Sequence, residues 1–242
     1  MINISGSELV EEIIKLEEDS IFEKISLFNY IVTSEFKFIR DISKPIEINK
    51  VIFQEKATFT SSVFMRQIEL CKVTFHKKLS FDGTVHHGHL RFTSGIFEQN
   101  VSINFCIFHK DLKLHGGVFK KNIGINKVMC NSGLYCEGEI SANAISIYSS
   151  TIKYEVQFMN EGKLDYLSLS ENNCKKTALY NANIGVLEIN DCSEEELIEI
   201  EDSQLDELRL EDLRNKGELL VKDSKLNSIT IINLINSKTL NF

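Results

Sequence analysis

The sequence predicts an all-β chain in which short parallel strands stack into one long solenoid. The first observation is an 11-residue repeat that runs without a gap through nine units from Val51. The second is that apolar, variable, apolar triplets recur inside each unit, a pattern typical of a strand that buries one face. Repeat proteins can exceed the usual size of a single core because each unit packs only on its neighbours. We therefore expect one domain.

Residues 1–20 differ from the repeat and predict an α-helix. Ser5 and Glu8 have the spacing of a capping box. The apolar residues that follow on one helical face are Leu9, Ile13 and Leu16. Because the terminal strand of a solenoid exposes unpaired backbone and a slice of core, we expect this helix to cap the first coil. Residues 21–242 are expected to form the solenoid itself.

The solenoid is most regular over residues 51–160. Its third position is usually phenylalanine, at Phe53, Phe64, Phe75, Phe97, Phe108 and Phe119. His86 takes this position once, where a packed core histidine is the better interpretation. Positions 7 and 9 are apolar in every unit. Residues 181–242 keep the triplets at spacings of 10 or 11 and form a less regular, acidic zone, with one slip of phase between Tyr180 and Ile189.

The first position of several units is small, and the stretches GIFEQ, CIFHK and GVFKK begin at Gly95, Cys106 and Gly117. This spacing resembles the pentapeptide-repeat proteins, whose units place a small residue two before a central Leu or Phe. The resemblance covers residues 50–160 and implies a right-handed parallel β-helix with four faces, about 22 residues per coil and about ten coils. The chain departs from that family in its 11-residue period and in lacking the usual Asn or Asp between the two inward residues.

The repeat alone leaves the cross-section of the coil open. A flattened solenoid of two sheets, with one repeat unit in each layer, fits the same spacing. A triangular coil of the bactofilin type fits it as well. All of these share parallel stacking of the strands, which is the firmer part of the prediction.

Composition excludes several classes of protein. Glu8, Glu11 and Glu12 lie where the apolar stretch of a secretory signal would fall, and no apolar run approaches the roughly 18 residues of a membrane span. The six cysteines contain no C-x-x-C pair, so we expect reduced core thiols rather than a zinc site. We therefore predict a soluble, cytoplasmic protein with no membrane contact, and the family resemblance implies a bacterial one.

No residue is assigned to catalysis, to a cofactor or to a metal. The gapless units leave no insertion from which a cleft could be built, and the glycine-rich nucleotide and hydrolase motifs do not occur. If two repeat units make one coil, His87 and His109 share a column on neighbouring coils, but the pattern fixes no third ligand. We expect these histidines to lie on a solvated surface, and we expect no enzymatic activity.

The second position of the units gives an ambiguous signal. It is apolar at Ile52, Val63, Val85, Ile96, Ile107, Val118, Met129 and Ile140. By strict alternation these residues face outward, where a contiguous apolar stripe would mark a partner surface. The alternative, which the sequence favours, is that the corner of the coil tucks them under a turn.

All the net charge of −8 comes from residues 193–218, which hold 11 acidic and 3 basic residues. The candidate acidic partner surface consists of Glu194, Glu195, Glu196, Glu199, Glu201, Asp202, Asp206, Glu207, Glu211 and Asp212. Three interpretations stay open: a solvated solenoid face, an amphipathic helix, or an acidic contact surface. The helix would use Leu197, Leu205, Leu208 and Leu213. Some pentapeptide-repeat proteins imitate duplex DNA, so the resemblance makes DNA mimicry one form of the third.

The repeat continues to the last residues printed. Ile229, Ile231, Leu240 and Phe242 therefore form a candidate C-terminal association edge, at which we expect two copies to meet as a homodimer.

Taken together, these patterns predict a non-enzymatic scaffold or protein-binding protein that acts through the faces of a rigid rod, with no direct nucleic-acid binding. A DNA-mimicking inhibitor or protector of a topoisomerase, or of another DNA-binding enzyme, is the alternative.

Overall fold

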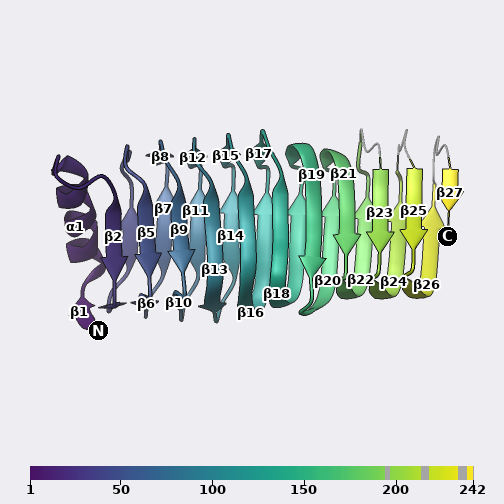
Figure 1. The fold of residues 1–242 in the computed structure, drawn as a ribbon, viewed down its shortest axis with the longest axis horizontal. Helices are drawn as coiled ribbons and strands as arrows, with labels where there is room; N and C mark the ends of the chain where they lie inside the picture. The colour runs from purple at the N-terminus through teal and green to yellow at the C-terminus, as the bar shows by residue number, and fades with distance from the viewer. Residues whose placement is uncertain (194–196, 214–217, 234–238, 242) are drawn as a thin grey trace.

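The computed structural model describes residues 1–193, 197–213, 218–233 and 239–241. It is a right-handed parallel β-solenoid of about nine turns, with about 22 residues per turn and a single helix at its N-terminal end (Figure 1). The predicted fold class is therefore confirmed. Within the described residues, no helix combines the length and the apolar character needed to cross a membrane.

Four columns of strand segments run the length of the rod, and each column defines one face. Face 1 contains β2 (Ile25–Phe28), β5 (Ile46–Asn49), β9 (Ile68–Cys71), the beginnings of β13 (Leu90–Phe97), β16 (Leu112–Asn126) and β18 (Leu134–Tyr148), the ends of β19 (Thr151–Asn160) and β21 (Asn173–Tyr180), then β23 (Leu197–Glu201), β25 (Glu218–Lys222) and β27 (Thr239–Asn241). Face 2 contains β1 (Ile2–Ile4), β3 (Tyr30–Val32), β6 (Ile52–Phe53), β10 (Thr74–Phe75) and later segments of β13, β16 and β18.

The remaining two columns complete each turn. Face 3 contains β4 (Phe36–Phe38), β7 (Ala57–Thr60), β11 (Leu79–Asp82), β14 (Val101–Asn104), the ends of β16 and β18, then the ends of β20 (Lys163–Ser170), β22 (Asn183–Asn190), β24 (Gln204–Glu211) and β26 (Lys225–Ile232). The beginnings of these last four strands continue face 2. Face 4 contains β8 (Val63–Phe64), β12 (Val85–His86), β15 (Ile107–Phe108), β17 (Met129–Cys130) and the beginnings of β19 and β21.

The pairing register settles the cross-section that the repeat left open. Leu79 pairs with Val101 on one side and with Ala57 on the other, so neighbours on one face are two repeat units apart along the chain. Two units therefore make one coil. Each coil carries four strand segments, which corresponds to the four-faced alternative. Successive units lie on opposite faces of the rod.

Stacked rings fill the interior, as the phenylalanine positions predict. Phe53, Phe75, Phe97 and Phe119 form one column, with ring centroids 4.6, 5.4 and 4.4 Å apart. In the opposite column His86 lies between Phe64 and Phe108, at 5.1 and 4.7 Å, and is completely buried. The core histidine is therefore confirmed. Five of the six cysteines are buried as well, and Cys71 is half-buried.

Left-handed residues turn the chain at the end of each face 1 and face 3 strand. Lys50, Ser61 and Lys72 have φ of 54°, 49° and 51°, and this conformation recurs at the equivalent corners of almost every coil. Asn and Asp adopt it more readily than most residues with a side chain. In the later coils these corners are taken by Asp191, Asp202, Asp212 and Asp223. Part of the C-terminal acidity is therefore explained by the geometry of the coil.

The coil shortens toward the C-terminus, and it does so earlier than the sequence indicated. Thr151 still pairs with Asn173, two full repeat units along the chain, but Glu155 pairs with Lys176, one position short of that distance. Where Lys163 pairs with Asn183, the distance is two positions short. The single slip expected after Tyr180 is thus wrong, because a residue is already lost on face 4 before that position. Inward triplets stay aligned because the shortening falls in the connections between them.

The helix α1 (Gly6–Glu18) covers the first coil at one end of the rod (Figure 1). The capping box is confirmed: the Glu8 amide donates to Ser5 Oγ at 3.2 Å and the Ser5 amide to Glu8 Oε2 at 2.7 Å. Leu9 and Ile13 are buried against the first coil. The strand β1, before the helix, pairs with β3 and was not predicted.

Candidate interaction surfaces

The acidic candidates lie on strands and corners of the solenoid rather than on a helix. Glu199 and Glu201 belong to β23, and Asp206, Glu207 and Glu211 belong to β24. Leu197 lies in β23 and Leu205 and Leu208 lie in β24, so the amphipathic-helix alternative is wrong. Leu205, Leu208 and Leu213 are buried in the core of the solenoid. Glu194, Glu195 and Glu196 lie outside the described residues.

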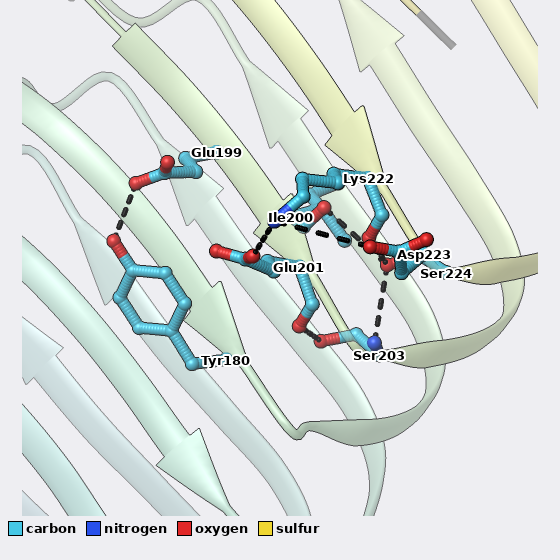
Figure 2. Close-up of polar contacts among 8 residues, drawn as sticks. All are labelled: Tyr180, Glu199, Ile200, Glu201, Ser203, Lys222, Asp223 and Ser224. Atoms are coloured by element: carbon cyan, nitrogen blue, oxygen red, sulfur yellow. Dashed lines mark hydrogen bonds and ion pairs between the residues drawn. The ribbon is translucent and has the colours of Figure 1, made fainter.

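On face 1 the carboxylates are bound by side chains of neighbouring coils. Glu199 forms an ion pair with Lys176 at 2.7 Å. It also accepts a hydrogen bond from the Tyr180 hydroxyl, while Glu201 pairs with Lys222 (Figure 2). Hydrogen bonds from Lys176 and Tyr180 lower the pKa of Glu199 below its ordinary value. Two of the predicted acidic residues are therefore members of cross-coil ladders.

On face 3 the partners of the acidic residues come from the same strand as well as from the next coil. Arg209 donates to both carboxylate oxygens of Glu207 at 2.8 Å, and this hydrogen bonding lowers the pKa of Glu207. The side-chain amide of Asn227 donates to Asp206 at 3.0 Å, and that of Asn233 donates to Asp212 at 2.8 Å. The ion pair with Arg209 reduces the negative charge that an approaching ligand would meet at Glu207, whereas the neutral asparagine amides orient Asp206 and Asp212 without neutralising them.

What remains of the acidic surface is concentrated at two corners of the rod. Asp202 and Asp223 follow each other on one corner, and Asp191 and Asp212 on the other, at left-handed positions. Asp202 and Glu211 have no ion pair within the described part of the chain. Beneath the first corner the Ser203 amide donates to Ser224 Oγ at 3.1 Å, which ties the two coils together (Figure 2).

Of the four residues in the candidate C-terminal association edge, the structure describes the side chains of Ile229 and Ile231. Ile229 and Ile231 are 40% and 38% exposed in β26, whereas Leu208 and Leu210 at the same positions of the previous coil are buried. Leu240 belongs to β27 and pairs with Leu219 through the backbone. Its side chain, and Phe242 as a whole, lie outside the described residues.

The apolar second position faces outward, contrary to the interpretation that the sequence favoured. Ile96, Val118 and Met129 are exposed, and Ile52, Val63, Val85 and Ile107 are half-buried. Ile140 is the exception, because a register shift in β18 turns it into the core. Since successive units alternate between faces, the residues form two columns on opposite sides of the rod. The sequence could not predict these two columns, because they exist only if two repeat units make one coil, and the spacing alone left the size of the coil open.

Shallow hollows occur on faces 1 and 2. One, of about 420 Å³, lies over Gly116, Gly117 and Gly138 beside the exposed Ile96 and Val118. Another, of about 260 Å³, has a charged lining formed by Glu69, Arg91, Thr93, Lys113, His115 and Glu137. In the second hollow His115 pairs with Glu137 at 3.6 Å, so part of its charge is compensated locally.

The surface histidines form a column as the coil length predicts. His87 and His109 stack with ring centroids 4.5 Å apart, and the Asn131 amide lies 3.2 Å from His109 Nδ1. In the described ranges no three His, Cys, Asp or Glu side chains gather in a way that could hold a metal ion. The column is thus a stacked surface ladder.

Comparison with known protein families, with curated proteins and with solved structures gives no match for this chain.

Proposed function

We propose that this protein is a non-enzymatic, intracellular scaffold of the pentapeptide-repeat type that binds other proteins through the faces of its rod. The observation that carries the proposal is the pair of outward apolar columns, in which Met129 reaches 50% exposure. A filled interior cannot take a ligand, whereas exposed apolar rows on a rigid surface favour contact with a macromolecule.

Photo-crosslinking in the producing cell tests this proposal. A benzophenone amino acid is placed at Ile96 on face 2 and at Met129 on face 4, with the exposed Gln99 as the matched control. We expect discrete protein adducts from one or both column positions and none from the control. Adduct patterns that are the same at all three positions would count against a binding function.

Association of two copies through the last coil is a second part of the proposal. The exposure of Ile229 and Ile231 supports it, because apolar residues at these positions are buried in the preceding coils. Sedimentation velocity over a range of concentrations is expected to show a dimer, and Ile232→Lys, at the exposed outward end of β26, is expected to weaken it. A strict monomer at every concentration would contradict this part.

DNA mimicry is the weaker alternative, because Glu199, Glu201 and Glu207 are already bound by basic side chains. A mimic must present free negative charge that competes with DNA and is screened by salt. In a supercoiling assay with a topoisomerase, we expect the scaffold to leave activity unchanged. Salt-sensitive inhibition that DNA relieves would instead support the mimic.

A further inference from the structure

Between residues 61 and 154, face 4 carries basic charge without acidic residues of its own. The preceding coil of this face contributes Asp41, whose carboxylate accepts a hydrogen bond from the Val63 amide. The face 4 strip consists of residues 61–66, 83–88, 105–110, 127–132 and 149–154, and none of these residues is Asp or Glu. Its basic residues are Arg66, Lys110, Lys127 and Lys153. All four are exposed, and none of them has an ion pair within the described chain. On other faces of the rod some basic residues pair across coils, as Lys120 does with Glu98 at 2.9 Å.

An apolar column runs through the middle of the strip. Val63 pairs with Val85, Val85 with Ile107, and Ile107 with Met129, so these side chains lie in successive coils of one face. Met65 is exposed beside the column, two residues after Val63. The strip therefore combines a central apolar row with basic residues on both flanks, since Lys127 lies on one side and Arg66 and Lys110 on the other.

Phe105, at the border of the strip, gives a second and independent reason to expect a binding site there. It occupies a left-handed corner at the border of the strip, with φ of 54°, and its side chain is 60% exposed. The equivalent corners in neighbouring coils are Ser61, Gly83, Lys127 and Ser149. A bulky aromatic residue in this conformation is strained, and such strain is typically retained where a side chain has a function. Lys127 Nζ lies 5.5 Å from the centre of its ring.

We propose that the face 4 strip docks an acidic amphipathic helix of a partner protein, with Phe105 as its aromatic anchor. The inference rests on the proposed scaffold function and names the partner's chemistry. Rows of the apolar column are about 4.8 Å apart, close to the roughly 5.4 Å rise of one helical turn, whereas same-face residues of a strand are about 6.7 Å apart. A helix can therefore place one apolar residue against each row and its acidic residues against the flanking cations.

Single-stranded nucleic acid is the competing polyanion, and the strip suits it less well. Bases bind proteins by stacking on aromatic rings. The central row of this strip is formed by Val63, Val85 and Ile107, which offer no flat ring to a base. The strip's exposed rings lie beside that row, and two of them, His87 and His109, already stack on each other. The acidic helix uses both the apolar row and the charges.

Fluorescence anisotropy with the full chain tests the proposal. The probes are labelled helical peptides of about 15 residues, or four turns, with leucine on one face and glutamate on the other. The controls are a peptide of the same composition without amphipathic order, a peptide with lysine in place of glutamate, and an oligothymidylate. We expect the acidic amphipathic peptides to bind, more weakly as salt increases, and the controls not to bind.

Two variants locate the binding site. The double variant Lys110→Glu with Lys127→Glu is expected to weaken binding about tenfold or more, while Lys121→Glu, exposed elsewhere on the same coils, leaves it unchanged. Phe105→Ser is expected to weaken binding and at the same time to raise the midpoint of urea unfolding, because strain at the corner is relieved. The matched control Phe28→Ser, an exposed aromatic residue of β2 on face 1, is expected to leave binding unchanged.

Each outcome decides the proposal. Failure of every acidic peptide to bind would overturn it, as would equal loss of binding in the strip and control variants. Binding of oligothymidylate through Lys110 and Lys127 would replace the helix with a nucleic acid. Crosslinks in the cell at Ile96 but not at Met129 would leave the scaffold function standing and reject the face 4 strip.

Discussion

At the scale of single residues, His86 is a fully buried polar side chain in a column of the core that is otherwise apolar. Its Nε2 lies 2.9 Å from Thr84 Oγ1, whereas Nδ1 has no hydrogen-bond partner among the described residues. Burial lowers the pKa of His86 to about 3, because the charged ring would lie between Phe64 and Phe108 without water. Neutral His86 therefore couples folding to pH.

His86→Phe is expected to stabilise the protein, and more strongly as pH falls. The unfolded histidine takes up a proton below about pH 6.5 and the folded one does not, so stability falls toward pH 5 by up to about 1.4 kcal/mol per pH unit. Urea unfolding between pH 7.5 and 5 measures this slope, which the variant should reduce. Some slope remains, since burial also lowers the pKa of His89.

The control is His87→Gln, which removes an exposed histidine and should keep the slope of the parent protein. Carboxylates such as Glu98, whose pKa is lowered to about 2 by hydrogen bonds from Lys120 and His76, lose their stabilisation only at lower pH. A parent slope that persists in full in His86→Phe would contradict the assignment.

At the scale of the elements, the 11-residue unit predicts its inward residues well and its outward contacts poorly. The phenylalanine columns and the capping helix follow from local spacing, so both could be read from the sequence. The partner of Glu199 could not, because the residue opposite it is Ala178 and Lys176 reaches it diagonally, from a strand where the coil had already shortened. The repeat pattern therefore predicts which side of the coil a residue faces, but it does not predict which side chain of the neighbouring coil that residue contacts.

Ser5→Ala is expected to loosen the helical cap. The Ser5 side chain satisfies the Glu8 amide, and loss of an N-cap typically costs about 1 kcal/mol. Hydrogen exchange followed by mass spectrometry should show faster exchange in α1 and β2 than in the middle of the rod. Glu11→Ala, an exposed substitution within the helix, is the control and should leave exchange unchanged. Equal loss of protection along the whole chain would argue against a local cap.

At the scale of the whole molecule, stability is distributed along a stack in which each coil contacts its neighbours. One column of stacked rings is continuous from Phe53 to Phe119, and charge pairs on the outer faces bridge neighbouring coils, as Lys120 and Glu98 do. Damage to one coil therefore weakens two interfaces directly.

Phe97→Ala is expected to lower the free energy of unfolding by about 3–5 kcal/mol, since it leaves a cavity between Phe75 and Phe119. Ile96→Ala, one residue away and facing solvent, should change it by less than about 0.5 kcal/mol. Urea unfolding measures both values. Similar losses in the two variants would mean that the inward and outward positions are not distinguished as described.

The coil of two repeat units also has a mechanical meaning. If the rod were pulled from its two ends, it would lengthen by releasing one winding at a time, because the hydrogen bonds between neighbouring windings would break one winding after another. Each released winding extends to about 75 Å of chain in place of a rise of about 4.8 Å. The molecule would then act as an extensible tether with evenly spaced steps, shorter where the windings lose one or two residues.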